Sequence, residues 1–209
     1  MAITVLVVIA VTVGWQLRDT ETKTDTAATT VRPATQVAAD TLRQAAVAMG
    51  AAASYRFVGT VEVGGHAISI AGEFAAPDRL HESVSLDGEA PVERIAIGAI
   101  AYQRNGTTWQ RVAGAATSGD PRGTFAALAR ATAVTPKGPG VSFELSGNAA
   151  GGLVTSGSAS TSVTGAVTIT NGNITDITYH STVAAGTTVH FAYSEIGTAP
   201  PVTVPQLTP

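Results

Sequence analysis

Residues 55–74 read YRFVGTVEVGGHAISIAGEF and decide the fold. Apolar and polar side chains alternate on both sides of Gly64-Gly65, and a period of two residues is the mark of a β-strand. A two-glycine connection favours a tight β-hairpin because both central residues can take positive φ. The hairpin places Val63 opposite His66, and in this register the apolar faces of the two strands agree.

More strands are predicted on the C-terminal side of this hairpin. Asn105-Gly106 is a strong two-residue turn signal and predicts a second hairpin, which pairs Tyr102 with Trp109. The other predicted strands, read from alternation and turn residues, cover residues 79–86, 92–97, 99–104, 141–145, 163–170, 174–183 and 187–193.

Two helices interrupt the strands. The first is predicted over Pro33–Ala53, and its modest apolar stripe comprises Val37, Leu42, Ala45, Ala46 and Met49. Asp120-Pro121 begins the second, over residues 122–133, with Phe125 and Leu128 on its apolar side. The order is helix, six strands, helix, four strands, which predicts an α+β fold: an antiparallel sheet covered by two helices on one face.

The N-terminal segment has a different character. Residues 1–17 contain an apolar run whose fifteen residues from position 3 span about 22 Å as a helix, against about 30 Å for a bilayer core. We interpret them as a membrane anchor or signal segment. Residues 18–32 are polar without periodicity and are expected to be a disordered tether. The folded domain is predicted over residues 33–205, with a tail at 206–209.

Composition excludes several classes of protein. The net charge is −3 and the basic residues are scattered, so no electrostatic footprint for nucleic acid exists. The chain has no cysteine, which excludes disulfides, thiolate metal sites and a cysteine nucleophile. Only 13% of residues are charged, a low share that favours an exported protein.

The element order resembles the LolA-like superfamily of lipoprotein carriers, and within it the actinobacterial LppX/LprG lipid-carrier branch. Four segments carry the resemblance: residues 55–59, 92–102, 105–109 and 193–202. In that family a curved antiparallel sheet, a half-barrel, is closed by helices around an apolar cavity for acyl chains. The resemblance therefore implies this fold and a lipid ligand. Members of the branch carry a lipobox cysteine after the signal, and this chain has none.

Catalytic and metal-binding signatures are missing from the sequence. It contains no Gly-x-Ser-x-Gly elbow, no phosphate-binding loop, no His-Glu-x-x-His and no dinucleotide fingerprint. A three-residue loop at 184–186 places His180 opposite His190, but no third ligand is apparent, so we predict two solvated histidines and no metal. We expect no catalytic residue and no cofactor.

The predicted ligand site is the apolar face of the sheet. The covering helices are rich in alanine, so a wide face is left underfilled and a ligand would supply the missing contacts. His66 would lie at the mouth of this cavity. The residues predicted to line it are Phe57, Val61, Ile68, Ile70, Phe74, Tyr102, Trp109, Tyr179 and Phe191.

Two functions remain open from the sequence, and a third, a hydrolase, would need a convergent polar site that the sequence does not show. The first is a non-enzymatic carrier or sensor of lipid acyl chains, tethered through residues 3–17 to the outer face of the cytoplasmic membrane. The alternative is a membrane-tethered regulatory module with a solid core and no ligand, whose sheet binds another envelope protein.

Overall fold

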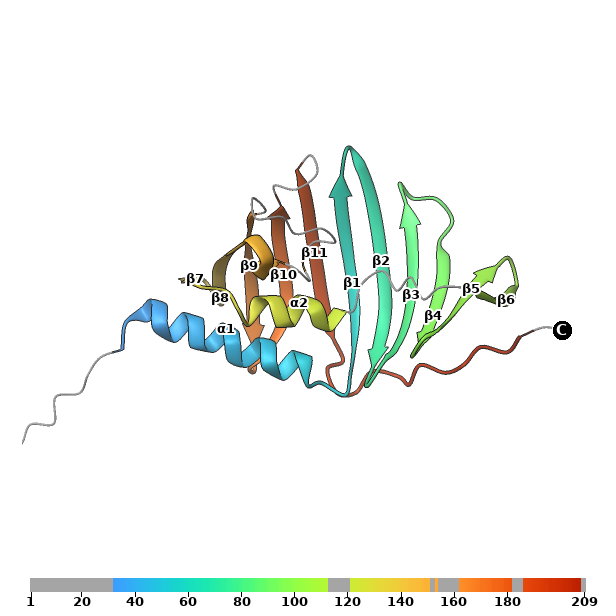
Figure 1. The fold of residues 1–209 in the computed structure, drawn as a ribbon, viewed down its shortest axis with the longest axis horizontal. Helices are drawn as coiled ribbons and strands as arrows, with labels where there is room; N and C mark the ends of the chain where they lie inside the picture. The colour runs from blue at the N-terminus through green and yellow to red at the C-terminus, as the bar shows by residue number, and fades with distance from the viewer. Residues whose placement is uncertain (1–31, 113–120, 151–152, 154–161, 182–185, 208–209) are drawn as a thin grey trace, which may run out of the picture. The chain divides into compact units, whose positions relative to one another are not determined.

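The computed structural model describes residues 32–112, 121–150, 153, 162–181 and 186–207 (Figure 1). The anchor predicted at 1–17 and all but the last residue of the tether predicted at 18–32 lie outside these residues. Within the described part, neither helix is long and apolar enough to cross a membrane.

The described residues form eleven strands and two α-helices. The first half contains α1 (Ala34–Gly50), β1 (Ser54–Val63), β2 (His66–Ala75), β3 (Arg79–Leu86), β4 (Val92–Ile97), β5 (Ile100–Asn105) and β6 (Thr108–Val112). The second half contains α2 (Pro121–Leu128), β7 (Ala133–Lys137), β8 (Gly140–Ser146), a 3₁₀ turn at Gly147–Ala150, β9 (Ser162–Thr170), β10 (Asn173–Ser181) and β11 (Thr187–Ser194).

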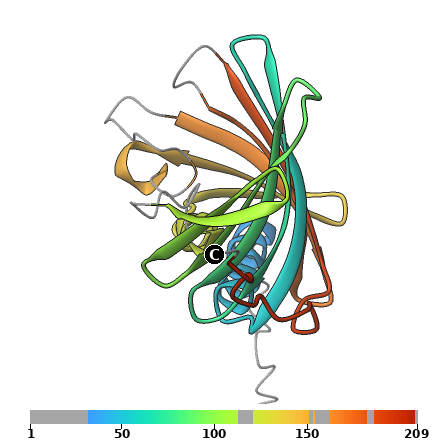
Figure 2. The same ribbon diagram turned by 90° about the vertical axis from the view of Figure 1, so that its right-hand side faces the viewer.

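All eleven strands belong to one sheet in the order β6-β5-β4-β3-β2-β1-β11-β10-β9-β8-β7. Two antiparallel meanders, β1 to β6 and β7 to β11, are joined where β1 pairs with β11. The sheet is curved and unclosed, with β6 and β7 at its edges (Figure 2). The α+β half-barrel predicted from the sequence is therefore confirmed.

The hairpin at Gly64-Gly65 has the predicted register. Val63 pairs with His66, and the ladder continues to Ser54 opposite Ala75. Gly64 and Gly65 have φ values of 59° and 85°, positive values that glycine adopts at no steric cost. The turn residues thus fix which side chains of β1 and β2 share a face.

The second hairpin forms, but its predicted register is wrong. Asn105 pairs with Thr108, so the turn residues are Gly106 and Thr107, and Trp109 pairs with Arg104 instead of Tyr102. The observed pairing of β5 with β6 is shifted by two residues from the predicted one. Because the side-chain period of a strand is also two, Tyr102 and Trp109 still lie on one face, as diagonal neighbours.

The second helix is shorter than predicted, and a strand was missed. α2 ends at Leu128, and β7 follows within the residues assigned to helix and loop. Thr135 precedes Pro136, and a residue before proline is driven toward extended backbone. Proline lacks the N–H for a ladder bond, and β7 accommodates it because it is an edge strand.

The core lies between the helices and one face of the sheet, here called the inner face. In α1 the buried residues are Ala38, Leu42, Ala45, Ala46 and Met49. Val37, predicted on this stripe, is exposed, and Ala38 takes its place at helical spacing from Leu42. The small alanines let the helix pack closely on β7 to β10.

A C-terminal strap, residues 198–207, runs past the lower ends of β2 to β4 (Figure 1) and packs on the opposite, outer face. Val202 is 4% exposed and packs with Ile95 and Tyr102 in a small second core. Arg79 Nη1 donates to the Val202 carbonyl at 3.0 Å, and Leu207 forms a parallel bridge with Trp109. The strap therefore covers the outer side of β4 and β5 and reaches edge strand β6.

We expect Val202→Asp to lower the free energy of unfolding by about 2–4 kcal/mol, because it places a charge in an apolar core. Val204→Asp is the matched control, since Val204 in the same strap is 56% exposed; it is expected to change stability by about 0.5 kcal/mol or less. Urea unfolding followed by tryptophan fluorescence measures both. Equal effects of the two substitutions would show that the strap does not stabilise the fold.

Candidate functional site

The helices cover only part of the inner face. α1 packs on β7 to β10, and α2 packs on α1. On α2, Phe125 meets the aromatic rings of Tyr55 and Tyr193 at centroid distances of 5.8 and 5.3 Å. Strands β2 to β6 and the upper end of β1 extend beyond both helices (Figure 1). With respect to these two helices, the inner face of the described residues has a covered half and a half without a helix above it, here called the uncovered half.

An open aliphatic strip lies on the uncovered half. It consists of six inner-face side chains on β1 to β4: Val61, Ile68, Ile70, Val84, Leu86 and Val92. Register aligns them in two rows, because Val61 pairs with Ile68 and Ile68 with Leu86, while Ile70 pairs with Val84 and Val84 with Val92. Directly paired side chains on one face are about 5 Å apart, so the strip is continuous.

The strip is accessible, unlike the core beside it. Leu86 and Val92 are 45% and 38% exposed. Val61 and Ile70 border the main core, whereas the other four side chains belong to neither apolar core of the described residues. Large contiguous apolar surfaces often mark binding sites. The strip is therefore the candidate site.

Seven of the nine predicted lining residues share the inner face. Phe57, Phe74 and Tyr179 are buried in the main core, so their side chains are packed against other protein residues. Val61, Ile68, Ile70 and Phe191 are partly exposed. Whether any of these seven touches a ligand stays a prediction.

The placement of Tyr102 and Trp109 on this face is wrong. Tyr102 pairs with Ile95, and Ile95 pairs with His81 on the outer face. Both aromatic residues belong to the small core under the strap. The inner-face positions of β5 are instead Ala101 and Gln103, so the aromatic character of Tyr102 was a misleading guide to its face.

Three strip residues were not among the predicted lining residues: Val84, Leu86 and Val92. The signal was present in the sequence, because alternation within residues 79–86 places Leu80, Val84 and Leu86 on one face. The sequence did not show how β4 pairs with β3, so Val92 could not be joined to them.

His66 lies at the open end of the strip, two residues from Ile68. Its Nδ1 is 2.7 Å from Asp87 Oδ2, and the Ala67 N–H donates to Asp87 Oδ1 at 2.8 Å. These two hydrogen bonds, the one with His66 first, lower the pKa of Asp87. The pair joins the β1–β2 hairpin to the end of β3. A cavity mouth at His66 remains a proposal.

The predicted pairing of His180 with His190 is wrong. His190 pairs with Thr178 and His180 with Thr188, a slip of two residues. His190 Nε2 lies 2.6 Å from Asp176 Oδ2, and His180 Nδ1 lies 3.0 Å from Thr188 Oγ1. In the part of the chain that the structure describes, no three metal-ligating side chains come together.

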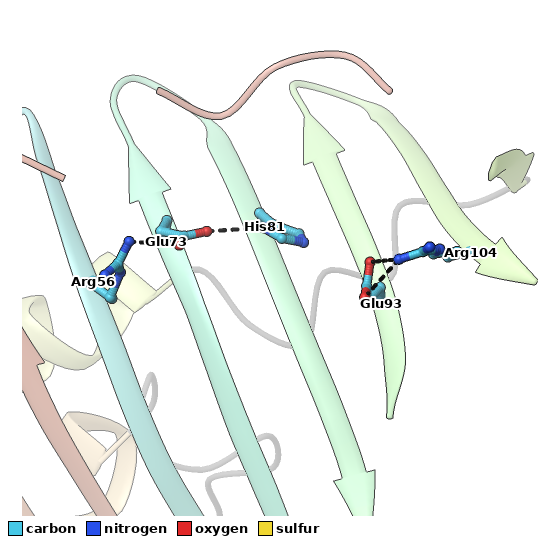
Figure 3. A network of polar contacts seen from close by, with 5 residues as sticks. All are labelled: Arg56, Glu73, His81, Glu93 and Arg104. Atoms are coloured by element: carbon cyan, nitrogen blue, oxygen red, sulfur yellow. Dashed lines mark hydrogen bonds and ion pairs between the residues drawn. The ribbon is translucent and has the colours of Figure 1, made fainter. Parts of the chain in front are cut away.

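Charged side chains of β1 to β5 pair on the outer face (Figure 3). Glu73 contacts Arg56 Nη2 at 3.3 Å and His81 Nδ1 at 2.9 Å, and Arg104 Nη1 donates to both Glu93 oxygens at 3.0 Å. Most of these groups are partly exposed, so each pair adds little stability. The outer face here is polar and largely paired within itself, but within the described residues the buried Arg56 Nε and His81 Nε2 have no hydrogen-bond partner.

Two inner-face tyrosines carry raised pKa values. Burial raises the pKa of Tyr179 to about 12, and burial also raises that of Tyr193 well above its usual value. The Tyr179 hydroxyl donates to the Leu153 carbonyl at 2.9 Å. Both phenols therefore stay protonated at neutral pH.

This shift predicts alkaline destabilisation. Because the folded pKa of Tyr179 exceeds the unfolded value near 10, its contribution is fully present below pH 10 and is lost as pH rises toward about 12. The loss amounts to about 2–3 kcal/mol for two pKa units. Tyr179→Phe should flatten the fall of unfolding free energy between pH 9 and 12, measured by urea titration at each pH. An unchanged slope would contradict the burial of the phenol.

The fold defines a class of protein: a half-barrel of antiparallel strands with helices on its inner face, as the LppX/LprG resemblance implied. Solved structures share it, among them LprF and LppX. LprF from Mycobacterium bovis superposes with a TM-score of 0.61 at 14% identity, over 81% of this chain and 97% of LprF. The lipoprotein LppX of Mycobacterium tuberculosis gives 0.56 at 12% identity, over 80% of this chain and 99% of LppX. No family model and no curated protein sequence matches the chain.

Proposed function

We propose that the chain is a non-enzymatic carrier or sensor of lipid acyl chains at the outer face of the cytoplasmic membrane. The observation that carries the proposal is the open aliphatic strip, which continues the main core onto the uncovered half of the inner face. The fold shared with the lipoprotein LppX and with LprF supports it. In this proposal residues 3–17 anchor the chain in the membrane and residues 18–32 are the tether.

The driving force is removal of acyl chains from water. Each buried methylene contributes about 0.8 kcal/mol, and the aliphatic side chains of the strip gain a cover at the same time. Branched side chains such as Ile68 and Val84 make van der Waals contact with a hydrocarbon chain whatever its direction along the strip. They have no polar atoms that would need a hydrogen bond. The strip therefore suits a flexible hydrocarbon chain.

The rival is a regulatory module that binds an envelope protein. The buried state of Phe57, Phe74 and Tyr179 favours it, since a solid core under the helices needs no ligand. In that case the strip would be covered by a protein partner. The two functions differ in whether the isolated chain holds lipid.

Native mass spectrometry of the full chain, released from detergent after incubation with cell-envelope lipid, tests the proposal. We expect adducts of lipid mass that survive detergent exchange and are recovered by organic extraction. Purely ligand-free protein under these conditions would contradict the carrier and favour the protein-binding rival.

A further inference from the structure

A polar row crosses the inner face beside the open aliphatic strip. Register places Gly72 opposite Glu82, Glu82 opposite Arg94, and Arg94 opposite Gln103. Gln103 in turn pairs with Gln110 on edge strand β6. These residues come from β2 to β6, on the half of the sheet that extends beyond the helices (Figure 1).

The row and the strip are neighbours on the same strands. Gly72, Glu82 and Arg94 each lie two residues along their strand from a member of the strip, namely Ile70, Val84 and Val92. Two residues of strand rise about 7 Å. On β2 to β4 the inner face thus changes from apolar at the strip to polar at the row within about 7 Å.

The polar groups at the β4–β6 end of the row have unused hydrogen-bonding capacity. Within the described residues, the guanidinium of Arg94 and the amides of Gln103 and Gln110 have no side-chain hydrogen bond or ion pair. Arg56 and Arg104, by contrast, are paired with carboxylates on the outer face (Figure 3). Arg94 and Gln103 are only partly exposed, so the sheet holds them in place.

The guanidinium of Arg94 is the charged group of the row that is nearest to solvent. Glu82, its cross-strand partner, is 3% exposed and is already engaged within the protein. Arg94 is partly exposed and has no ion pair within the described residues. Its positive charge therefore favours an anion at the solvent side of the row.

We infer that Arg94, Gln103 and Gln110 form a subsite for the anionic, phosphate-bearing headgroup of a lipid whose acyl chains lie on the open aliphatic strip. This inference rests on the proposed function and adds the ligand class and its orientation. A guanidinium presents two parallel donors that match two phosphate oxygens, and the amides add neutral donors on the same side.

The test compares two lipids that differ only in the headgroup. The full chain in a non-ionic detergent is titrated with dioleoylphosphatidylglycerol or with dioleoylglycerol, and bound lipid is counted by native mass spectrometry. Arg94→Gln is expected to weaken phosphatidylglycerol binding about 10- to 100-fold, the worth of a charge-assisted hydrogen bond, while dioleoylglycerol binding stays the same. Arg104→Gln, the outer-face control on the neighbouring strand, should leave both unchanged.

The outcomes separate this inference from the proposed function. If wild-type protein binds neither lipid, the lipid carrier itself fails. If it binds both and Arg94→Gln weakens them equally or not at all, only the headgroup subsite is overturned. Glycerol 3-phosphate, added alone, should not displace phosphatidylglycerol at equal concentration; efficient displacement would assign the row to a free phosphate compound.

Discussion

Phe125→Ala is expected to lower the free energy of unfolding by about 3–5 kcal/mol, the range for removal of a buried aromatic side chain. Phe125 has no exposed surface and lies edge-on to Tyr55 at 5.8 Å and tilted against Tyr193 at 5.3 Å. It is the residue through which α2 enters the aromatic core at the junction of β1 and β11. The loss is a large part of the stability of a typical domain, about 5–15 kcal/mol.

Urea unfolding of the full chain, followed by circular dichroism, measures this effect. Val47→Ala is the control, because Val47 is an exposed apolar residue of α1, and it should change stability by about 0.5 kcal/mol or less. A loss below about 1 kcal/mol for Phe125→Ala would mean that α2 does not hold the two meanders together.

Ile68→Asp is expected to weaken lipid binding at least about 30-fold, which corresponds to about 2 kcal/mol of lost apolar contact. The carboxylate would lie in the middle of the open aliphatic strip, where an acyl chain offers it no hydrogen bond. Ile68 is outside both apolar cores of the described residues, so the fold should lose only about 1 kcal/mol.

Val58→Asp is the matched control for Ile68→Asp. Val58 lies on β1, pairs with Ala71 on the outer face and is 56% exposed. Both variants add one negative charge to the same hairpin, so a general effect of charge on membrane association would appear in both. Transfer of a fluorescent phospholipid between vesicles measures the difference, and equal loss in the two variants would contradict a role for the strip.

The positions of most strands were predictable because apolar and polar residues alternate with a period of two in their sequences. The β1–β2 hairpin was predicted down to its register, since Gly64-Gly65 fixes the turn and the apolar faces agree in the alignment that this turn sets. At the β5–β6 and β10–β11 connections the pairing slipped by two residues. A slip of two leaves every side chain on its face, so the hydrophobic pattern could not exclude it.

The candidate site was harder to predict because the face on which a side chain lies depends on how each strand pairs with the next. Tyr102 and Trp109 were assigned to the inner face by their aromatic character, whereas the ladder through Ile95 puts them under the strap. Strand β7 was missed because Pro136 suggested a helix stop instead of an edge strand. Val92 and Arg94 became visible only once the β3–β4 register was known.

The central claim is that acyl chains lie on the open aliphatic strip, and photocrosslinking tests it most directly. The full chain is loaded with a phospholipid that carries a diazirine in its acyl chain, irradiated and digested, and the labelled residues are mapped by mass spectrometry. We predict labels on β2 and β3, at Ile68, Ile70, Val84 and Leu86, that disappear with excess unlabelled phospholipid. Labels confined to residues 3–17 or to the outer-face residues around Tyr102 would contradict the account.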